Sequence, residues 1–264
     1  MKIALITGAS SGMGREFAIQ IPKMYQNLDE LWVIARRQDR LETLQKDLSI
    51  PVRIFPGNMQ ENEIFERVES ALTEEHADIR MLVNAAGFGK MKKAEEIEVS
   101  EQCSMVDLNC KALTRMTLLC LPYLSRGSRI VNLASAAAFC PQPGFAVYAA
   151  SKSYVLSFSR ALNEELDNRK ISVTAVCPGP VDTEFFDRAG ALPSEGKKIF
   201  RAKADAVVRQ ALKDAARRAP VSVYGTAMRA SRIFAGILPD GLLVKIMARI
   251  NHINGKIRKE DDKR

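Results

Sequence analysis

Short apolar runs alternate along the chain with longer stretches in which apolar residues return every three or four positions. The runs predict strands over residues 3–7, 31–35, 52–55, 81–84, 129–133, 172–177 and 221–224. The periodic stretches predict helices over residues 15–25, 40–48, 63–76, 101–124, 147–168 and 204–217. Strands that are apolar throughout and separated by helices indicate a parallel sheet covered on both faces. We therefore expect one doubly wound α/β domain over residues 1–225.

Residues 226–264 extend past the last predicted strand. They hold two further apolar stripes with helical spacing, separated by Pro239-Asp240-Gly241. The stripes consist of Met228, Ile233, Phe234, Ile237 and Leu238, then of Leu242, Leu243, Ile246, Met247 and Ile250. Because Lys and Arg accompany them, we expect a basic amphipathic helical extension of the domain.

The net positive charge is concentrated toward this end of the chain. The 264 residues include 39 Lys and Arg against 31 Asp and Glu, a net charge of +8, and the 47% hydrophobic content is that of an ordinary globular protein. Residues 184–264 contain 18 basic and 9 acidic side chains, whereas residues 1–183 contain 21 and 22. The explanation of the excess charge therefore has to lie in the last third of the chain.

Three interpretations of the extension are open. Its helices could pack on the domain or on a partner subunit and leave a solvated basic face. They could instead lie at an anionic membrane surface, as basic amphipathic helices do, in a peripheral membrane contact. Nucleic-acid binding is the weakest interpretation, and we expect no nucleic-acid partner, because no recognised nucleic-acid module accompanies the charge.

Cysteine usage and the N-terminal residues indicate a cytoplasmic protein. The five cysteines include no Cys-x-x-Cys pair, and only four apolar residues precede Thr7-Gly8, too few for the core of a signal peptide. His76 and His252 stand alone in charged stretches, so no metal site is expected. The longest uncharged run, residues 130–151, contains two prolines and Gly144, which a membrane-spanning helix would not accept together.

A glycine-rich loop follows the first predicted strand. Its sequence is Thr7-Gly8-Ala9-Ser10-Ser11-Gly12-Met13-Gly14, and a helix comes directly after it. In this position Gly8 permits a tight turn, Gly12 lets the backbone approach a pyrophosphate, and Gly14 lets helix and strand pack closely. The helix N-terminus adds unpaired N–H groups and the positive end of its dipole, so the segment predicts a dinucleotide site.

The end of the second predicted strand indicates which dinucleotide is bound. A carboxylate at this point would bind the adenosine ribose of NAD, but this chain has Arg36 and Arg37. Guanidinium groups suit a 2′-phosphate, and Arg15 in the glycine loop could add a further contact. We therefore expect NADP(H) as the cofactor.

Tyr148 and Lys152 lie at the start of a long predicted helix. Their spacing of four residues places the phenol and the ammonium on one helical face, one turn apart. A free phenol has a pKa of about 10, which is too high for a base at neutral pH. A neighbouring ammonium favours the phenolate, so the pair suits proton transfer.

Ser135 follows the fifth predicted strand and lies 13 residues before Tyr148. The glycine loop, this serine and the Tyr-x-x-x-Lys pair together resemble the short-chain dehydrogenase/reductase family. Further motifs match in order: Asn84-Ala85-Ala86-Gly87 after the fourth strand, Asn109 in the first long helix, and Cys177-Pro178-Gly179-Pro180-Val181-Asp182-Thr183 after the sixth strand. The resemblance covers residues 1–225 and implies a Rossmann fold.

This resemblance implies a role for each matching residue. Tyr148 is expected to be the general acid in reduction and the general base in oxidation, with Ser135 orienting the substrate oxygen. Lys152 would hold the nicotinamide ribose and lower the pKa of Tyr148, and Asn109 would fix a water in the proton relay. The expected cofactor contacts are Gly8, Ser10, Ser11, Gly12, Met13, Gly14, Arg15, Arg36, Arg37, Asn58, Met59, Asn84, Ala85, Ala86, Gly87, Tyr148, Lys152, Pro178, Gly179, Val181 and Thr183.

The chain departs from the family pattern at two positions. The family often has a second Asn where this chain has Ala85, and an Asp where it has Asn58. Neither change touches the residues expected to transfer the proton. The resemblance also implies a homodimer or homotetramer that associates through the two long helices containing Asn109 and Tyr148.

Apolar residues flank the expected catalytic set on loops that follow strands, where doubly wound folds bind ligands. The expected substrate-pocket residues are Phe88, Ser135, Phe139, Phe145, Phe185 and Phe186. They predict a lipophilic ketone or secondary alcohol, with a hydroxysteroid as the leading case and a 3-oxoacyl chain as the alternative. Residues 184–200 are expected to form a mobile lid. A nucleotide-sensing or membrane-attached binding protein without catalysis is the alternative from another class.

Overall fold

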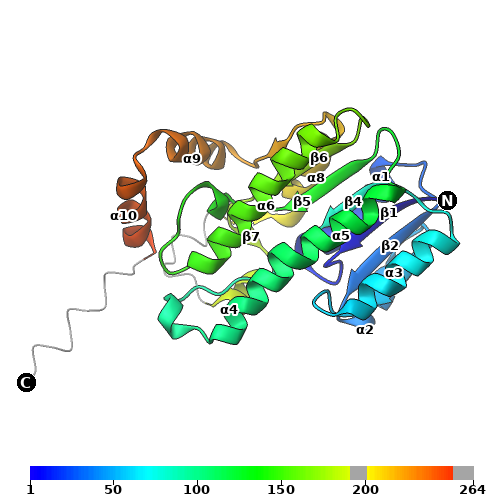
Figure 1. Ribbon diagram of the computed structural model, residues 1–264, viewed down its shortest axis with the longest axis horizontal. Coiled ribbons are helices and arrows are strands. Elements are labelled where there is room, and N and C mark those ends of the chain that lie inside the picture. Colours follow the sequence, from blue (N-terminus) through cyan, green and yellow to red (C-terminus); the bar gives the residue numbers. More distant parts are fainter. Residues whose placement is uncertain (191–200, 252–264) are drawn as a thin grey trace, which may run out of the picture.

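The computed structural model describes residues 1–190 and 201–251 of the chain. Its centre is a seven-stranded sheet in the order β3-β2-β1-β4-β5-β6-β9, with every neighbouring pair parallel. The strands are β1 (Lys2–Thr7), β2 (Glu30–Ala35), β3 (Val52–Pro56), β4 (Asp78–Asn84), β5 (Arg129–Leu133), β6 (Ser172–Val176) and β9 (Val221–Ser222). The strand order reverses beside β1, so the predicted doubly wound fold is confirmed (Figure 1).

Helices pack on both faces of this sheet. On one face lie α1 (Gly12–Met24), α2 (Gln38–Asp47) and α8 (Ala204–Ala216); on the other lie α3 (Asn62–Glu74), α5 (Leu113–Cys120) and α6 (Ala146–Glu165). Alternate residues of β1 pack against the two helical layers. Ile3 and Leu5 pack on the side of α3, α5 and α6, and Ala4 and Ile6 pack on the side of α1, α2 and α8. Burial on both sides is the reason why the strand is apolar throughout.

The helix predicted over residues 101–124 is divided into segments. It consists of α4 (Val99–Val106), the π-helical η2 (Asp107–Ala112), α5, and the short 3₁₀ turn η3 (Leu121–Tyr123). The widened π-helical turn carries Asn109, whose buried side chain bonds both backbone groups of Phe88. Single π-helical turns inside α-helices are found frequently at functional sites.

Several short elements follow the core strands without a clear signal in the sequence. They are the 3₁₀ turns η1 (Ala94–Glu96) and η4 (Ala136–Phe139), the helix α7 (Phe185–Ala189) and the two-residue strands β7 (Val181–Asp182) and β8 (Ala202–Lys203), which pair in parallel. The expected lid over residues 184–200 therefore begins with α7, and its remainder at 191–200 lies outside the described residues.

The extension forms α9 (Thr226–Ile237) and α10 (Asp240–Ile250), as its apolar stripes predict. Pro239 precedes α10 and ends the connection between the two helices. Both helices lie at one end of the molecule, away from the N-terminus (Figure 1). In the described ranges, no helix combines the length and apolar composition needed to cross a membrane.

Close packing of α1 against the loop after β1 provides a test of this fold. A Cβ atom added to Gly14 would lie 2.2 Å from the carbonyl oxygen of Gly8, which is backbone and cannot move aside. We expect Gly14→Ala to lower the free energy of unfolding by about 1–3 kcal/mol, as overpacking does. Gly236→Ala in α9 is the control, because its Cβ would meet nothing within 4 Å. Denaturant unfolding that shows equal stability for both variants would contradict this packing.

Candidate active site

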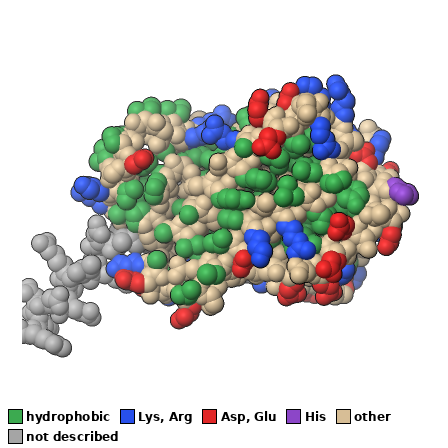
Figure 2. Space-filling view, in the orientation of Figure 1, with side chains coloured by type: hydrophobic (Ala, Val, Ile, Leu, Met, Phe, Trp, Pro, Cys, Tyr) green, Lys and Arg blue, Asp and Glu red, His purple; other side chains and the backbone are tan. Residues whose placement is uncertain are grey.

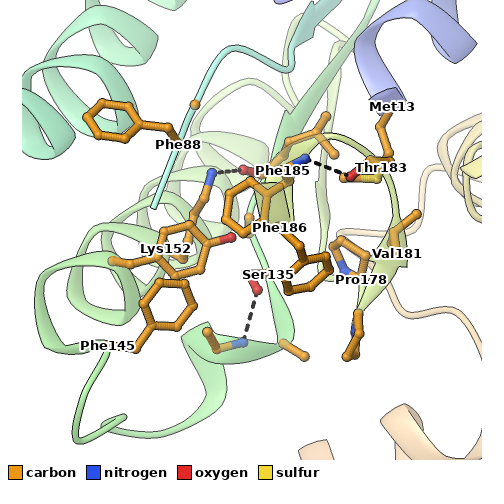
Figure 3. A pocket seen from close by; sticks show the side chains of 18 of the residues that line it. Met13, Phe88, Ser135, Phe145, Lys152, Pro178, Val181, Thr183, Phe185 and Phe186 are labelled. Atoms are coloured by element: carbon orange, nitrogen blue, oxygen red, sulfur yellow. Dashed lines mark hydrogen bonds between the residues drawn. The ribbon is translucent and has the colours of Figure 1, made fainter. Parts of the chain in front are cut away.

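A cleft of about 680 Å³ opens at the carboxyl ends of the parallel strands. It is bounded by the glycine loop, the ends of β2, β4 and β5, and the segment after β6 (Figure 3). The predicted site residues that line it are Gly8, Ser10, Ser11, Gly12, Met13, Gly14, Arg36, Arg37, Asn58, Met59, Ala85, Ala86, Gly87, Phe88, Ser135, Phe139, Phe145, Tyr148, Lys152, Pro178, Gly179, Val181, Thr183, Phe185 and Phe186. The structure thus brings together both groups of residues, those expected at the cofactor and those expected at the substrate.

Three predicted residues do not line the cleft. The guanidinium of Arg15 pairs with Asp47 at 2.9 Å, and this contact holds it on the surface of α1. Asn84 is buried under the cleft, where its Nδ2 donates to Asn132 Oδ1 at 2.9 Å. Asn109 is fully buried behind the loop after β4. Arg15 and Asn84 have side-chain partners within the protein, so their contacts with the cofactor stay predictions.

The glycine loop has the backbone conformation that a phosphate cradle requires. Gly8 has φ +71° and Gly12 has φ +54°, values that side chains disfavour. A Cβ on Gly8 would come within 2.7 Å of the backbone nitrogen of Ala86, so glycine is needed for the approach of these two loops. Ser11 precedes α1 without capping it through its hydroxyl. The first-turn residues of α1 line the cleft, and the N–H groups of a helix N-terminus are suited to bind an anion.

A cluster of charges lies at the end of β2. Arg37 donates from Nε and Nη2 to Ser10 Oγ at 3.3 and 3.2 Å, and its Nη1 pairs with Glu184 Oε2 at 2.9 Å. Arg40, one turn further along the chain, pairs with the other oxygen of Glu184. Hydrogen bonds from Arg40 and Arg37 lower the pKa of Glu184 to about 2, so this carboxylate is ionised at neutral pH. The sequence did not lead us to expect Arg40 and Glu184 in this cluster. The spacing of Arg37 and Arg40 by three residues, which indicates one helical face, could have pointed to Arg40.

Tyr148, Ser135 and Lys152 converge at the middle of the cleft. The Tyr148 ring stacks on Phe145 with centroids 4.2 Å apart, and the Ser135 side chain lies close enough to lower the pKa of its hydroxyl. Burial raises the pKa of Tyr148 to about 12, against a smaller lowering by Ser135. Desolvation of the phenolate is the largest cause, and the expected lowering of this pKa by Lys152 stays a prediction. Tyr148 is therefore a protonated phenol at neutral pH.

Lys152 is buried beside this phenol. Its Nζ donates to the backbone oxygen of Leu133 at 2.7 Å and lies 5.7 Å from the centroid of the Tyr148 ring. Burial lowers the pKa of Lys152 to about 8. At neutral pH the side chain still carries its charge, at a free-energy cost to the fold. A charge kept at such a cost is typical of functional sites.

Asn109 supports the cleft from behind. Its Oδ1 accepts from the backbone nitrogen of Phe88 at 3.1 Å, and its Nδ2 donates to the backbone oxygen of Phe88 and to Ser151 Oγ. A Cβ on Gly87 would lie 2.9 Å from Asn109 Oδ1 and 3.3 Å from Lys152 Nζ. Asn109 thus sets the position of the loop after β4, while its expected part in a proton relay stays a prediction.

The substrate end of the cleft is apolar and partly built by the extension. Figure 3 shows the rings of Phe145, Phe185 and Phe186 around the Ser135 side chain. Sequence reasoning did not place the extension here, but its apolar stripes complete the wall through Met228, Phe234, Leu238, Leu243, Ile246, Met247 and Ile250. Asn251 ties the end of α10 to this wall, since its Nδ2 donates to the backbone oxygen of Pro143 at 2.9 Å.

Comparison with known proteins identifies the family to which this constellation belongs. The family described as short chain dehydrogenase matches residues 2–193. Sulfoacetaldehyde reductase 2 of Chromohalobacter salexigens is 35% identical over 75% of this chain and 81% of its own length. A short-chain dehydrogenase of Sphingobium yanoikuyae, solved with NADPH, is 28% identical with a TM-score of 0.76, over 92% of this chain and 95% of that one. A 3-ketoacyl-(acyl-carrier-protein) reductase of Brucella melitensis, solved with NADH, is 26% identical with a TM-score of 0.73, over 84% and 96%.

The chain belongs to the short-chain dehydrogenase family and is an oxidoreductase of that family. Membership alone does not distinguish the two dinucleotides, because one solved relative holds NADPH and the other NADH. The relatives give no support to a hydroxysteroid dehydrogenase subtype. Cofactor preference and substrate therefore have to be argued from the residues of this chain.

The buried charge of Lys152 leads to a prediction about stability. A pKa that falls from 10.5 to about 8 on folding corresponds to a cost of about 3 kcal/mol for keeping the ammonium charged. A side chain without the ammonium avoids this cost but loses the hydrogen bond to Leu133, which contributes about 1 kcal/mol. We expect Lys152→Met to raise the free energy of unfolding by about 2 kcal/mol at pH 7.

The sign of this effect follows from linkage. The cost is fully present below pH 8, where the ammonium is charged in both states, and it disappears between about 8 and 10.5, where only the unfolded chain stays protonated. Denaturant unfolding at pH 7 and pH 10 should therefore show a gain that shrinks as the pH rises. The exposed Lys213 of α8 serves as control through Lys213→Met. A gain that is constant with pH would contradict the assignment.

Proposed function

We propose that the protein is an NADP(H)-dependent oxidoreductase that interconverts a lipophilic ketone and the corresponding secondary alcohol. The observation that carries this proposal is the convergence of Ser135, Tyr148 and Lys152 between a glycine cradle and an apolar wall. The cradle suits a dinucleotide, the three polar residues suit proton transfer to a carbonyl oxygen, and the wall suits an apolar substrate.

The cleft fits the proposed cofactor. The uncapped start of α1 and the φ values of Gly8 and Gly12 suit the pyrophosphate, and Arg36 and Arg37 at the end of β2 suit a 2′-phosphate. Lys152 would hold the nicotinamide ribose. When bound, the reduced dinucleotide supplies the hydride, and the protein supplies binding, orientation and the proton.

Proton transfer is assigned to Tyr148. Its raised pKa keeps the phenol protonated, so in reduction it donates a proton to the carbonyl oxygen that Ser135 also contacts. In the reverse direction the phenolate takes the proton of the alcohol, and the ammonium of Lys152 stabilises that phenolate. Both steps take place in a site where the Phe145 and Phe185 rings exclude water from the phenol.

The lining favours an apolar substrate over a charged one. Among the described residues of the cleft, the cationic ones are Arg36, Arg37 and Lys152, and none of them belongs to the aromatic wall. A sulfonate such as that of sulfoacetaldehyde would need a cation there, since an unpaired anion is costly to bury. A hydroxysteroid or a 3-oxoacyl chain matches the chemistry of the wall, and the proposal covers both.

The outer surface of α5 and α6 supports a homodimer or homotetramer. Leu118 on α5 and Tyr154 on α6 are large apolar side chains that are exposed. Figure 2 shows hydrophobic side chains gathered along these two helices. We include such an oligomer in the proposal, because a contiguous apolar surface of this kind marks association sites.

Replacing the proposed acid tests the chemistry. Tyr148→Phe keeps the ring and its stacking on Phe145 but removes the hydroxyl. We expect turnover of an apolar ketone to fall by about 10²–10⁴-fold while NADPH binding stays within about twofold of the wild type. Tyr154→Phe, an exposed tyrosine on the same helix, is the matched control and should keep full turnover. Wild-type protein that binds NADPH but reduces no ketone in a broad panel would favour the non-catalytic binding protein instead.

Replacing the charged groups at the end of β2 tests the cofactor preference. We expect the wild type to prefer NADPH over NADH, and Arg37→Gln to lower kcat/KM for NADPH by about 10–100-fold with little effect on NADH. Glu184→Gln frees Arg37 and Arg40 from their carboxylate partner and should raise the affinity for NADPH. Both cofactors are compared in one assay, and a clear preference for NADH would refute this part of the proposal.

A further inference from the structure

The helices α9 and α10 have two apolar faces, and among the described residues only one of them is covered. The inner face, with Leu238, Leu243 and Met247, lines the cleft. The outer face leaves Ile233 62% exposed and Ile237 72% exposed. Figure 2 shows hydrophobic side chains gathered over these two helices at one end of the molecule. Isolated exposed apolar residues are common, but a cluster at the mouth of a cleft marks an interaction surface.

Basic side chains border this outer face on both helices. Arg229 lies one turn before Ile233 on α9, and Lys245 and Arg249 lie one and two turns after the exposed Leu242 on α10. Arg232 completes the set, and Asp240 is the single acidic residue between residues 226 and 251. Apolar side chains flanked by cations match the boundary of an anionic bilayer, where acyl chains lie below phosphates.

We propose that the outer face of α9 and α10 docks on an anionic lipid surface and that the substrate cleft opens toward that surface. The docking itself stands independently of the enzymatic proposal. Its consequence, entry of the substrate from the bilayer, rests on the proposed function. The same two helices form the inner wall of the cleft and the outer docking face, so docking would bring the apolar end of the cleft close to the bilayer.

The charge pattern favours a bilayer over a second copy of the chain. In a two-fold symmetric contact the same patch meets itself, so Arg232, Lys245 and Arg249 would face identical cations. Like charges brought together in this way oppose association. Lipid phosphates provide the opposite charge at the same depth as the apolar side chains.

A vesicle flotation assay with the full chain tests the docking. We expect at least about tenfold more protein on phosphatidylglycerol-containing vesicles than on pure phosphatidylcholine vesicles, and partial release by high salt. Ile233→Ser with Ile237→Ser should remove most of this binding, since neither residue lines the cleft. Arg232→Gln with Arg249→Gln should abolish the preference for anionic lipid.

Two matched controls make the result specific. Met24→Ser with Val99→Ser removes exposed apolar side chains from α1 and α4 and should leave vesicle binding intact. Binding that is the same in wild type and in the Ile233 and Ile237 variant would overturn the proposal. The proposal would also be overturned if the wild type does not bind vesicles and the Ile233 and Ile237 variant has a lower molar mass in solution than the wild type. The outer face would then join two copies of the chain.

Turnover separates this proposal from the proposed enzymatic function. With a water-soluble ketone and no vesicles, the Ile233 and Ile237 variant should match the wild type, because the catalytic residues are untouched. With a ketone dissolved in anionic vesicles, its kcat/KM should fall by about fivefold or more, in line with lost surface binding. Vesicle binding without any turnover would refute the proposed enzymatic function and support the docking proposal. Turnover without vesicle binding would support the enzymatic function and refute the docking proposal.

Discussion

The position of β1 between two helical layers determines where everything else in this protein can lie. Ile3 and Leu5 face one core and Ala4 and Ile6 the other, so the strand has no solvent-facing side, and both of its neighbours are parallel to it. Parallel strands bring all their carboxyl ends to one edge. The glycine loop, Ser135 and the segment after β6 therefore meet at one cleft, although up to about 170 residues separate them along the chain.

The same burial that stabilises the sheet sets the chemistry of the cleft. Desolvation raises the pKa of Tyr148 and lowers that of Lys152, and in both cases it is the largest cause. Both shifts favour the uncharged form, so burial keeps the Tyr148 phenol protonated and makes the charge of Lys152 costly to hold. The hydrogen bond from Lys152 to Leu133 and the stacking on Phe145 keep both groups in place. The charge of Lys152 that the proposed function uses therefore lowers the free energy of unfolding.

Several site residues could be predicted because the chemistry is local in the sequence. Gly8, Gly12 and Gly14 form one turn between a strand and a helix, and Tyr148 and Lys152 share one helical face. Arg15 shows what this reasoning leaves out, since its place in the sequence suggested a phosphate contact, whereas the structure pairs it with Asp47 on another helix. Arg40 and Glu184 show the converse, because their ion pair joins segments 144 residues apart.

The sequence by itself determined the alternation of strands and helices, the glycine cradle and the tyrosine–lysine pair, because each depends on side-chain periodicity or on residues a few positions apart. It also determined that the positive charge lies near the C-terminus. Only the tertiary structure decided where the helices of that extension lie: among the described residues, the inner faces of α9 and α10 line the apolar end of the cleft and the outer faces are exposed. An amphipathic pattern indicates that a helix has an apolar face. Which part of the protein that face packs against depends on the positions of elements distant in the sequence.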